Sequence, residues 1–392
     1  MTNVKNHVIS VLFIKGGLKW KIKGIGFIDF FSEIPDHRMN RRKLHSVEEV
    51  FLVVFCGMIA ACDSWGDLEL FGKTKLDYLR KYLPFKHGIP SDDTLRRFFR
   101  VLDPEIFESC FIKWVRSFQI DLADRIVAID GKTSRRSFDG ENRAMHLVSA
   151  FVSELGITLG QLKTADKSNE ITAIPELLEM LDLAGSIVTI DAMGCQTKIV
   201  EKIVDKDANY VIGLKGNQGQ LNEEVRLVFE KKPNNMIFLT DEECDKGHGR
   251  LEIRRCTVTE DIQWLKDRHP KWKGLNSLVE IESSREIKGE VATEKRYYIS
   301  SLPAQPKILS HAVRQHWGVE NKLHWVLDIC FNDDQSRIRK GNAPRNIAIV
   351  KKTVLNLLQV IKKTKPRISL KAMRKLAGWD QGFLDTVLMA KF

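Results

Sequence analysis

Two short stretches of this sequence decide its fold: Ile126-Val127-Ala128-Ile129-Asp130-Gly131 and, further along the chain, Ile187-Val188-Thr189-Ile190-Asp191. Each is a short β-branched run followed by an aspartate, a pattern typical of a buried strand that ends at a polar residue. In open α/β sheets, polar side chains at the carboxyl ends of neighbouring strands meet at one edge, where binding sites form. We therefore predict two buried strands that deliver Asp130 and Asp191 to the same edge of a sheet.

The residues between and after these stretches predict the rest of an α/β sheet. Two more strands are expected around the turn Glu154-Leu155-Gly156, then a proline-started helix, and a further helix that separates Asp191 from a third strand. The expected ranges are, in chain order, Met145–Val152, Ile157–Leu162, Pro175–Leu183, Thr197–Val204 and Tyr210–Leu214. Strands joined by helices indicate a mixed or parallel sheet with covered faces.

Outward from this centre, the character of the chain changes several times. In the N-terminal third, Ser46 and Glu49 have the spacing of a capping box, and Ser91 and Asp103 stand where helix N-caps are favoured. Arginines on these helices make the segment a candidate DNA reader, although an ordinary helical bundle with solvated arginines would carry the same pattern. The expected segments are an extension (1–25), a small helical domain (26–120), the first part of the core (121–232), a β-rich insertion (233–303), and C-terminal core helices with a basic tail (304–392).

The composition favours a polyanionic partner. The 392 residues contain 62 Lys and Arg against 51 Asp and Glu, a formal charge of +11, and 43% of them are hydrophobic, which is enough for real cores. Seven cysteines without a C-x-x-C pair fit neither a disulfide framework nor a zinc ribbon. The longest apolar run, Val50–Cys62, is too short to span a bilayer and predicts a buried helix. We expect a cytoplasmic, nucleoid-associated protein.

A third acid is expected from a different element that faces the same edge, and Glu320 is the candidate. It lies in the stretch Arg314-Gln315-His316-Trp317-Gly318-Val319-Glu320-Asn321-Lys322-Leu323-His324-Trp325. On a regular helix His316 and His324 lie one turn to either side of Glu320, so that all three share a face. Buried among the tryptophans and leucines of this stretch, a glutamate would need a metal or another partner.

Three carboxylates at one edge would suit magnesium, which takes oxygen ligands. Two plainer interpretations stay open at this point. Strand-end aspartates often do no more than cap a turn, and the stretch around Glu320 could be an amphipathic helix whose polar face meets water.

The C-terminal tail has the composition of a phosphate-binding surface. From Gln335 to Lys375 the sequence contains no Asp or Glu but many Lys and Arg. An apolar stripe through the same segment predicts one packed face and one basic face. The residues expected to contact DNA are four of the early tail, three that follow predicted strands, and the histidine before Glu320: Arg337, Arg339, Lys340, Arg345, Lys132, Lys215, Asn217 and His316.

Several motifs, taken in order, resemble those of the H-repeat-associated insertion-sequence transposases. They are Ile34-Pro35-Asp36-His37-Arg38, Pro90-Ser91-Asp92-Asp93-Thr94, Ile129-Asp130-Gly131-Lys132, Lys167-Ser168-Asn169-Glu170-Ile171, Thr189-Ile190-Asp191-Ala192-Met193, Gly213-Leu214-Lys215-Gly216-Asn217-Gln218, His248-Gly249-Arg250 and His316-Trp317-Gly318-Val319-Glu320-Asn321. The resemblance implies an RNase H-like catalytic core with a β-rich insertion between the second aspartate and the glutamate. It also implies that Asp130, Asp191 and Glu320 are the catalytic DDE triad and bind divalent metal.

The function expected from these observations is metal-dependent cleavage and strand transfer of an insertion sequence. Two Mg²⁺ or Mn²⁺ ions held by the triad would activate water or a 3′-hydroxyl and stabilise the leaving oxygen. The partners would be double-stranded DNA, as element ends and as target, and further copies of the chain in a homo-oligomer. Three alternatives stay open: a nuclease or resolvase that never joins strands, a catalytically silent DNA-binding relic, and a zinc enzyme that uses His316, Glu320 and His324.

Overall fold

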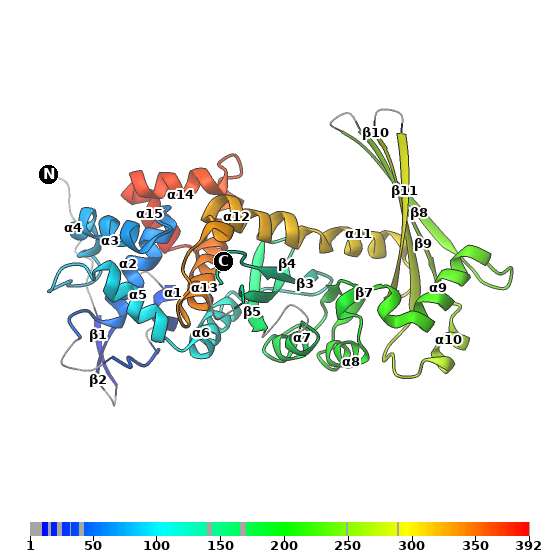
Figure 1. Ribbon diagram of the computed structural model, residues 1–392, viewed down its shortest axis with the longest axis horizontal. Coiled ribbons are helices and arrows are strands. Elements are labelled where there is room, and N and C mark those ends of the chain that lie inside the picture. Colours follow the sequence, from blue (N-terminus) through cyan, green and yellow to red (C-terminus); the bar gives the residue numbers. More distant parts are fainter. Residues whose placement is uncertain are drawn as a thin grey trace.

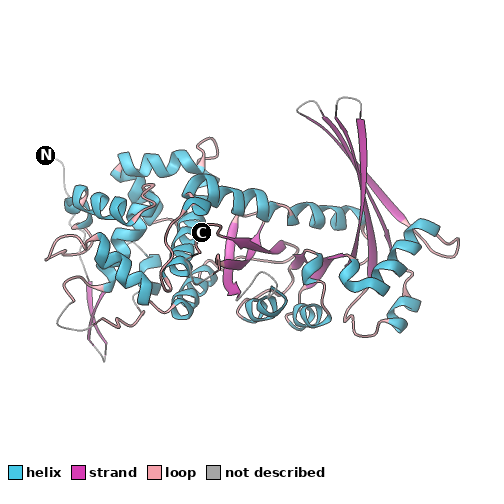
Figure 2. Ribbon diagram, viewed as in Figure 1, coloured by secondary structure: helices cyan, strands magenta, loops and turns pink. Residues whose placement is uncertain are grey.

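The molecule is elongated, with helices gathered at one end, a sheet through the middle and an arm of long strands at the other end (Figures 1 and 2). This computed structural model describes residues 10–14, 17–21, 26–31, 33–38, 43–138, 143–164, 170–247, 250–287 and 290–391. Of the motifs quoted above, Lys167-Ser168-Asn169 and His248-Gly249 lie outside the described residues.

A nine-stranded mixed sheet with the order β5-β4-β3-β6-β7-β11-β10-β9-β8 forms the frame of the molecule. Strands β3, β6 and β7 run parallel, and the other neighbouring pairs run antiparallel. The predicted α/β class is confirmed. The strands are β3 (Ile126–Thr133), β4 (His146–Val152), β5 (Ile157–Thr164), β6 (Ile187–Ile190), β7 (Asn209–Leu214), β8 (Leu239–Gly247), β9 (Arg250–Thr259), β10 (Ser277–Ile287) and β11 (Glu290–Ser300).

Strand β3 differs from the prediction in a way that matters for the site. Its parallel ladder pairs residues 126–129 with 187–190 of β6, but β4 continues to pair with β3 as far as Thr133. Asp130 therefore lies inside the strand, opposite Ser149 of β4, and the predicted strand end after residue 129 was wrong. The consequence is a more rigid placement of Asp130, because the strand continues on both sides of it.

Helices cover both faces of the parallel part of the sheet. α7 (Glu170–Glu179) and α8 (Thr197–Asp205) lie on one face, below the sheet in Figure 1, and α11 (Pro306–His316) packs against β3 and β6 on the other. The prediction that Pro175 starts α7 was wrong, since the helix begins at Glu170 and holds the proline in its interior. The extra turn is tolerated because it buries Ala173 and Ile174, while a proline removes only one helical hydrogen bond.

The helical end packs N-terminal and C-terminal helices around one core. The predicted capping box of Ser46 and Glu49 and the N-caps at Ser91 and Asp103 are all present. Phenylalanine rings from α1, α2, α5 and α6 contact one another at its centre, as Phe51 does with Phe107. The helices are α1 (Gly26–Phe31), α2 (Val47–Ile59), α3 (Trp65–Thr74), α4 (Leu76–Leu79), α5 (Asp92–Val101), α6 (Pro104–Arg116), α12 (Trp325–Phe331), α13 (Ala343–Thr364), α14 (Leu370–Trp379) and α15 (Gln381–Leu388).

Helix α13 departs from the tail that the sequence predicted. A packed face and a basic face were expected, but Lys351 and Lys352 are only 2% and 3% exposed. Nζ of Lys351 donates to Oδ1 of Asp333 at 2.8 Å, and Nζ of Lys352 donates to Oε1 of Gln161 and Oγ of Ser149. The prediction of a basic face along this part of the tail was therefore wrong, because both ammonium groups find partners inside the molecule.

The β-rich segment of residues 233–303 continues the core sheet. β11 pairs antiparallel with β7, and β10, β9 and β8 follow outward as the arm (Figure 2). α9 (Gly219–Lys231) and α10 (Gln263–Arg268) lie near the base of the arm. In the expected N-terminal extension, β1 (Ser10–Ile14) and β2 (Gly17–Lys21) form a separate two-stranded hairpin. Within the described ranges, no helix combines the length and apolar character needed to span a membrane.

Candidate active site

The register of the two central strands places Asp130 beside Asp191. Ile129 is paired with Ile190 in the parallel ladder, so the two aspartates are the next residues along neighbouring strands, which lie roughly 4.8 Å apart. After β6 the chain turns into η3 (Ala192–Gly194), and Oδ1 of Asp191 accepts a hydrogen bond from the N–H of Met193 at 3.0 Å. Asp191 is therefore a cap, as the plainer interpretation had it, and also one of two adjacent acids at the sheet's edge.

A cleft of about 590 Å³ brings the third predicted acid to the same place. Residues of β6, β7, β11 and α11 contribute to its walls. Asn217 lies beside it, where its Nδ2 donates to the carbonyl oxygen of the lining residue Ala192 at 2.7 Å. The predicted site residues that line the cleft are Asp130, Asp191, Lys215, His316 and Glu320.

Glu320 starts a π-helical turn, η5 (Glu320–His324), between α11 and α12. A π turn holds one more residue than an α turn, so side chains four positions apart no longer stack as on a regular helix. Glu320 is exposed, while His324 is buried and does not line the cleft with it and His316. The prediction that all three share a face was wrong, and the exposure of Glu320 agrees with the plainer interpretation, in which the polar residues of this stretch meet water. The glutamate faces open solvent in the cleft.

The electrostatics of the cleft favour a bound cation. Burial raises the pKa of Asp130 to about 7, and the negative charges of Asp191, Glu170 and Glu320 act in the same direction. Nδ1 of His324 lies 3.5 Å from Oδ2 of Asp130, but burial lowers the pKa of this histidine to about 3. Its ring is therefore neutral near pH 7 and cannot balance the carboxylates.

The donor set of the cleft fits Mg²⁺ or Mn²⁺ better than zinc, because its three acids offer oxygen ligands. Among the described residues, the carboxylate oxygens of these three acids do not all lie within 4.8 Å of one another. A single ion could therefore not contact all three side chains in the positions that they have here. His316, Glu320 and His324 do not gather within that distance either, and Nδ1 of His316 instead lies 3.1 Å from Oγ1 of Thr189.

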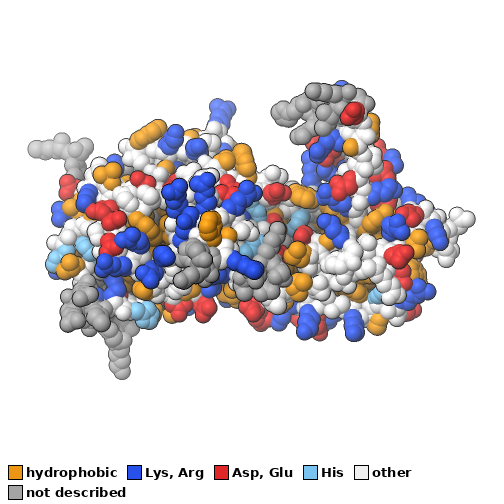
Figure 3. Space-filling model, viewed as in Figure 1, with side chains coloured by type: hydrophobic (Ala, Val, Ile, Leu, Met, Phe, Trp, Pro, Cys, Tyr) orange, Lys and Arg blue, Asp and Glu red, His pale blue; other side chains and the backbone are white. Residues whose placement is uncertain are grey.

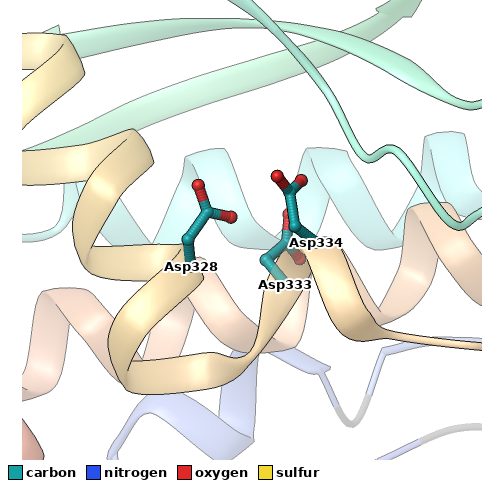
Figure 4. Close-up of side chains that lie close together, drawn as sticks. All are labelled: Asp328, Asp333 and Asp334. Atoms are coloured by element: carbon teal, nitrogen blue, oxygen red, sulfur yellow. The ribbon is translucent and has the colours of Figure 1, made fainter.

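A second acidic group, formed by Asp328, Asp333 and Asp334, does have possible ligand atoms within 4.8 Å of one another (Figure 4). Its charge is already balanced by three cations, so we interpret it as an ion-pair network that joins β3 to α12, α13 and η6 (Asp333–Gln335). Lys132 pairs with Asp328 at 2.8 Å, Lys351 pairs with Asp333 at 2.8 Å, and Arg135 pairs with Asp334 at 3.4 Å. Lys132, expected to contact a phosphate, is thus engaged inside the protein with a side chain only 13% exposed.

The four early-tail residues that were expected to contact DNA differ in their exposure to solvent. Arg337 and Lys340 are exposed. Arg339 is partly buried and stacks over the ring of Phe138, 5.0 Å from its centroid. Arg345 has a side chain only 12% exposed and pairs with Glu105 of α6 at 3.7 Å. Three of the four therefore lie at the surface, and Arg345 belongs to the contact between α13 and α6.

Sequence reasoning missed a buried pair directly behind the candidate catalytic strand. Nε2 of His146 lies 2.5 Å from Oε1 of Glu170, and its Nδ1 lies 2.8 Å from Oγ1 of Thr133. A side chain at Gly131 would overlap both the histidine and the glutamate, so the residue next to Asp130 has to be glycine unless its neighbours move. The available signal was that Glu170 lies in one of the recurring motifs, but nothing in the sequence pairs it with His146.

Comparisons with known proteins identify the family of the chain. The model of the family described as Transposase DDE domain matches residues 121–357, and the model described as DDE_Tnp_1-associated matches residues 28–115. The putative transposase YncI of Escherichia coli O157:H7 is 43% identical over 92% of this chain and 94% of its own length. The H repeat-associated putative transposase YhhI of Escherichia coli strain K12 is 41% identical over 92% of this chain and 97% of its own length.

Among solved structures, a piggyBac transposase synaptic complex with hairpin DNA matches 93% of this chain and 77% of its own, at 11% identity and a TM-score of 0.45. The sequence matches place the chain among enzymes that act on DNA. It belongs to the DDE transposase family, and its relatives include H repeat-associated putative transposases, so the resemblance seen in the motifs is confirmed.

Proposed function

We propose that Asp130, Asp191 and Glu320 are the three catalytic acids of this transposase, and that they hold two Mg²⁺ or Mn²⁺ ions with which the protein cuts and joins the strands of an insertion sequence. The observation that carries the proposal is that two adjacent strand positions and a helix residue far away in sequence line one cleft. The raised pKa of Asp130 supports it, because burial, together with the neighbouring carboxylates, opposes ionisation of this group when no cation is bound.

We also propose that β5-β4-β3-β6-β7 is the RNase H-like core that the resemblance implies, with β8–β11 as its insertion. In support, the first three strands in sequence form an antiparallel meander and the next two lie parallel to β3 on its other side. The insertion falls between Asp191 and Glu320, as the resemblance requires.

The chain's own residues would orient the reaction. β3 fixes the position of Asp130, with the neutral ring of His324 3.5 Å from its Oδ2, and the backbone N–H groups of η3 hold Asp191. Lys215 on the wall of the cleft supplies a positive charge for a phosphate oxygen. When bound, the metal ions would favour deprotonation of the attacking water or 3′-hydroxyl and stabilise the leaving oxygen.

The partners follow from this chemistry. Joining an element's two ends to a target requires double-stranded DNA in more than one segment and more than one catalytic cleft. We therefore propose that the protein works as a homo-oligomer on DNA in the cytoplasm. A nuclease or resolvase that cuts without joining is the second candidate, since the same three carboxylates would serve both reactions.

One experiment separates the two candidates. The purified protein is incubated with Mg²⁺, a labelled duplex that carries the DNA end bordering its gene, and an unlabelled plasmid. A transposase cuts the duplex at the element boundary and transfers the label covalently to the plasmid. Cutting without any transfer, over a range of target sequences and protein concentrations, would assign the protein to the nucleases instead.

A further inference from the structure

Two basic segments that the sequence offered as separate candidates for DNA binding are in direct contact. On α5, Arg97 and Arg100 are exposed. The carbonyl oxygen of Arg100 accepts a hydrogen bond from the N–H of Asn342 at 3.1 Å, and a Cβ at Gly341 would lie 2.7 Å from Cγ of Arg100. The loop of residues 336–342 therefore lies directly against the C-terminal end of α5, although 240 positions separate Leu102 and Asn342, which are also hydrogen-bonded.

A third basic segment lies on the far side of the same loop. Nε of Arg339 donates to the carbonyl oxygen of Arg136 at 2.8 Å, and its guanidinium stacks over Phe138. The turn of residues 134–138 directly follows β3, and Arg135 and Arg136 are exposed on it. Sequence reasoning did not single out these two arginines, because only the folded loop brings them to the basic tail.

The three segments lead back to the candidate active site. Lys132 lies two positions after Asp130 on β3, so the two side chains leave the same face of the strand. Lys132 and Arg135 both approach Asp334, at 3.5 and 3.4 Å, which connects the catalytic strand to the start of the loop. A path of contacts therefore runs from Asp130 to α5.

The charge along this path is strongly positive. Residues 92–101, 134–138 and 334–342 together contain eight Lys and Arg and three Asp. Of these acids, Asp93 pairs with Arg96 and Arg97, and Asp334 is shared as described. Lys and Arg side chains gather on this face over α5, α12 and α13 (Figure 3). A merely solvated surface would mix both signs more evenly.

We propose that α5, the turn 134–138 and the loop 336–342 form one continuous phosphate-binding surface, the basic ridge, along which duplex DNA runs outward from the catalytic cleft. This inference rests on the proposed function and deepens it. In this proposal the N-terminal helices and the basic tail both contribute residues to one DNA-binding surface. The ridge recognises the sugar–phosphate backbone, since arginines that contact phosphates position a duplex without reading its bases.

The test uses two paired variants of the full-length protein, one in each half of the ridge. Arg97→Gln with Arg100→Gln changes α5, and Arg337→Gln with Lys340→Gln changes the loop. Arg339 is left intact because it also holds the turn. The matched control is Lys231→Gln with Lys271→Gln, which removes two exposed charges far from the ridge.

Binding of a duplex with an element end is measured at several salt concentrations in Ca²⁺ or chelator, so that the readout does not depend on cleavage. Each ridge pair is expected to lower the slope of log affinity against log salt by about 1.8, which corresponds to two lost phosphate contacts, and the control pair should leave it unchanged. Phosphate-ethylation interference is then compared between variants. Some phosphates interfere with binding of the wild-type protein when ethylated but no longer do so with a ridge variant. For the two ridge pairs, these phosphates should lie within about one helical turn of each other, on one side of the cut.

An unchanged salt slope in either ridge pair, with a thermal unfolding midpoint equal to that of the wild type, would overturn the proposal. Interference sites on separate DNA segments would also overturn it, since they would mean two surfaces. The proposed function is tested by a separate measurement, cleavage of the duplex by the wild-type protein in Mg²⁺. If the wild-type protein does not cut but the ridge contacts are present, the proposed function fails and the ridge proposal stands.

Discussion

Proton release on metal binding is the sharpest quantitative consequence of the candidate site. In the metal-free protein, burial and the neighbouring carboxylates raise the pKa of Asp130 from its ordinary value of 3.8 to about 7. A metal ligand must be deprotonated, so a bound ion competes with a proton at this carboxyl. Lowering the pH through 7 should therefore weaken metal binding. The site histidines do not obscure the effect, because burial lowers the pKa of both His316 and His324.

The size of the effect follows from the value of about 7. With that pKa, about 9% of the Asp130 carboxyl is ionised at pH 6 and about 91% at pH 8. The apparent affinity for Mn²⁺ should be about tenfold lower at pH 6 than at pH 8, since it scales with the ionised fraction. Binding should release about 0.9 proton at pH 6 and about 0.1 at pH 8.

The same shift has a consequence for folding without metal. Between about pH 4 and pH 7 the folded protein holds a proton on Asp130 that the unfolded chain has released. The contribution of this group to stability therefore falls as the pH rises through that window, and added metal should restore it.

Mn²⁺ binding is measured by electron paramagnetic resonance at pH 6, 7 and 8, and proton release by calorimetry in buffers of different ionisation enthalpy. In the Asp130→Asn protein, which keeps the shape of the side chain, binding should be weaker and its pH dependence should vanish. A wild-type affinity that stays constant between pH 6 and pH 8, with less than about 0.2 proton released at pH 6, would refute the assignment of Asp130 as a ligand with a raised pKa.

Three further outcomes are expected. Gly131→Ala forces a methyl group against Glu170 and His146, so it should lower the free energy of unfolding by about 1–3 kcal/mol and remove most of the cleavage activity. A urea midpoint and a cleavage rate equal to those of the wild type would contradict this. Lys351→Met leaves the buried Asp333 without its main partner and should cost about 3–5 kcal/mol in urea unfolding, so a loss below about 1 kcal/mol would show that the pair is not needed. After chelation, Mg²⁺ or Mn²⁺ alone should restore cleavage, whereas restoration by zinc alone would point to a different ligand set.

The sequence predicted the elements whose patterns are local. β6 was predicted at Ile187–Ile190 and begins and ends there, because a short β-branched run followed by an aspartate carries its own boundaries. The capping box at Ser46 was equally readable, since both of its partners lie within four residues. The two aspartates could be placed side by side because the carboxyl ends of parallel strands meet at one edge.

Features that depend on distant partners could not be predicted in this way. β3 runs past Asp130 because β4 pairs with it, and no local pattern reveals how far an antiparallel partner extends. Lys351 and Lys352 have the sequence pattern of surface charges, but in the fold their ammonium groups donate hydrogen bonds to Asp333 of η6 and to residues of the sheet. The π turn at Glu320 removes His324 from the cleft that His316 and Glu320 line, because the extra residue in that turn leaves no trace in a pattern of 3.6-residue periodicity.

The most direct test of the catalytic triad is strand cleavage by the Glu320→Gln protein, because Glu320 is the acid contributed from outside the two central strands. The substrate is the duplex with an element end, in Mg²⁺, and the matched control is Glu201→Gln, an exposed glutamate on α8. The triad assignment predicts that Glu320→Gln unfolds at the wild-type temperature and binds the duplex normally but cuts it at least about a hundredfold more slowly, while the control cuts at the wild-type rate. Wild-type cleavage by Glu320→Gln would contradict the central claim, since the amide cannot serve as an anionic metal ligand.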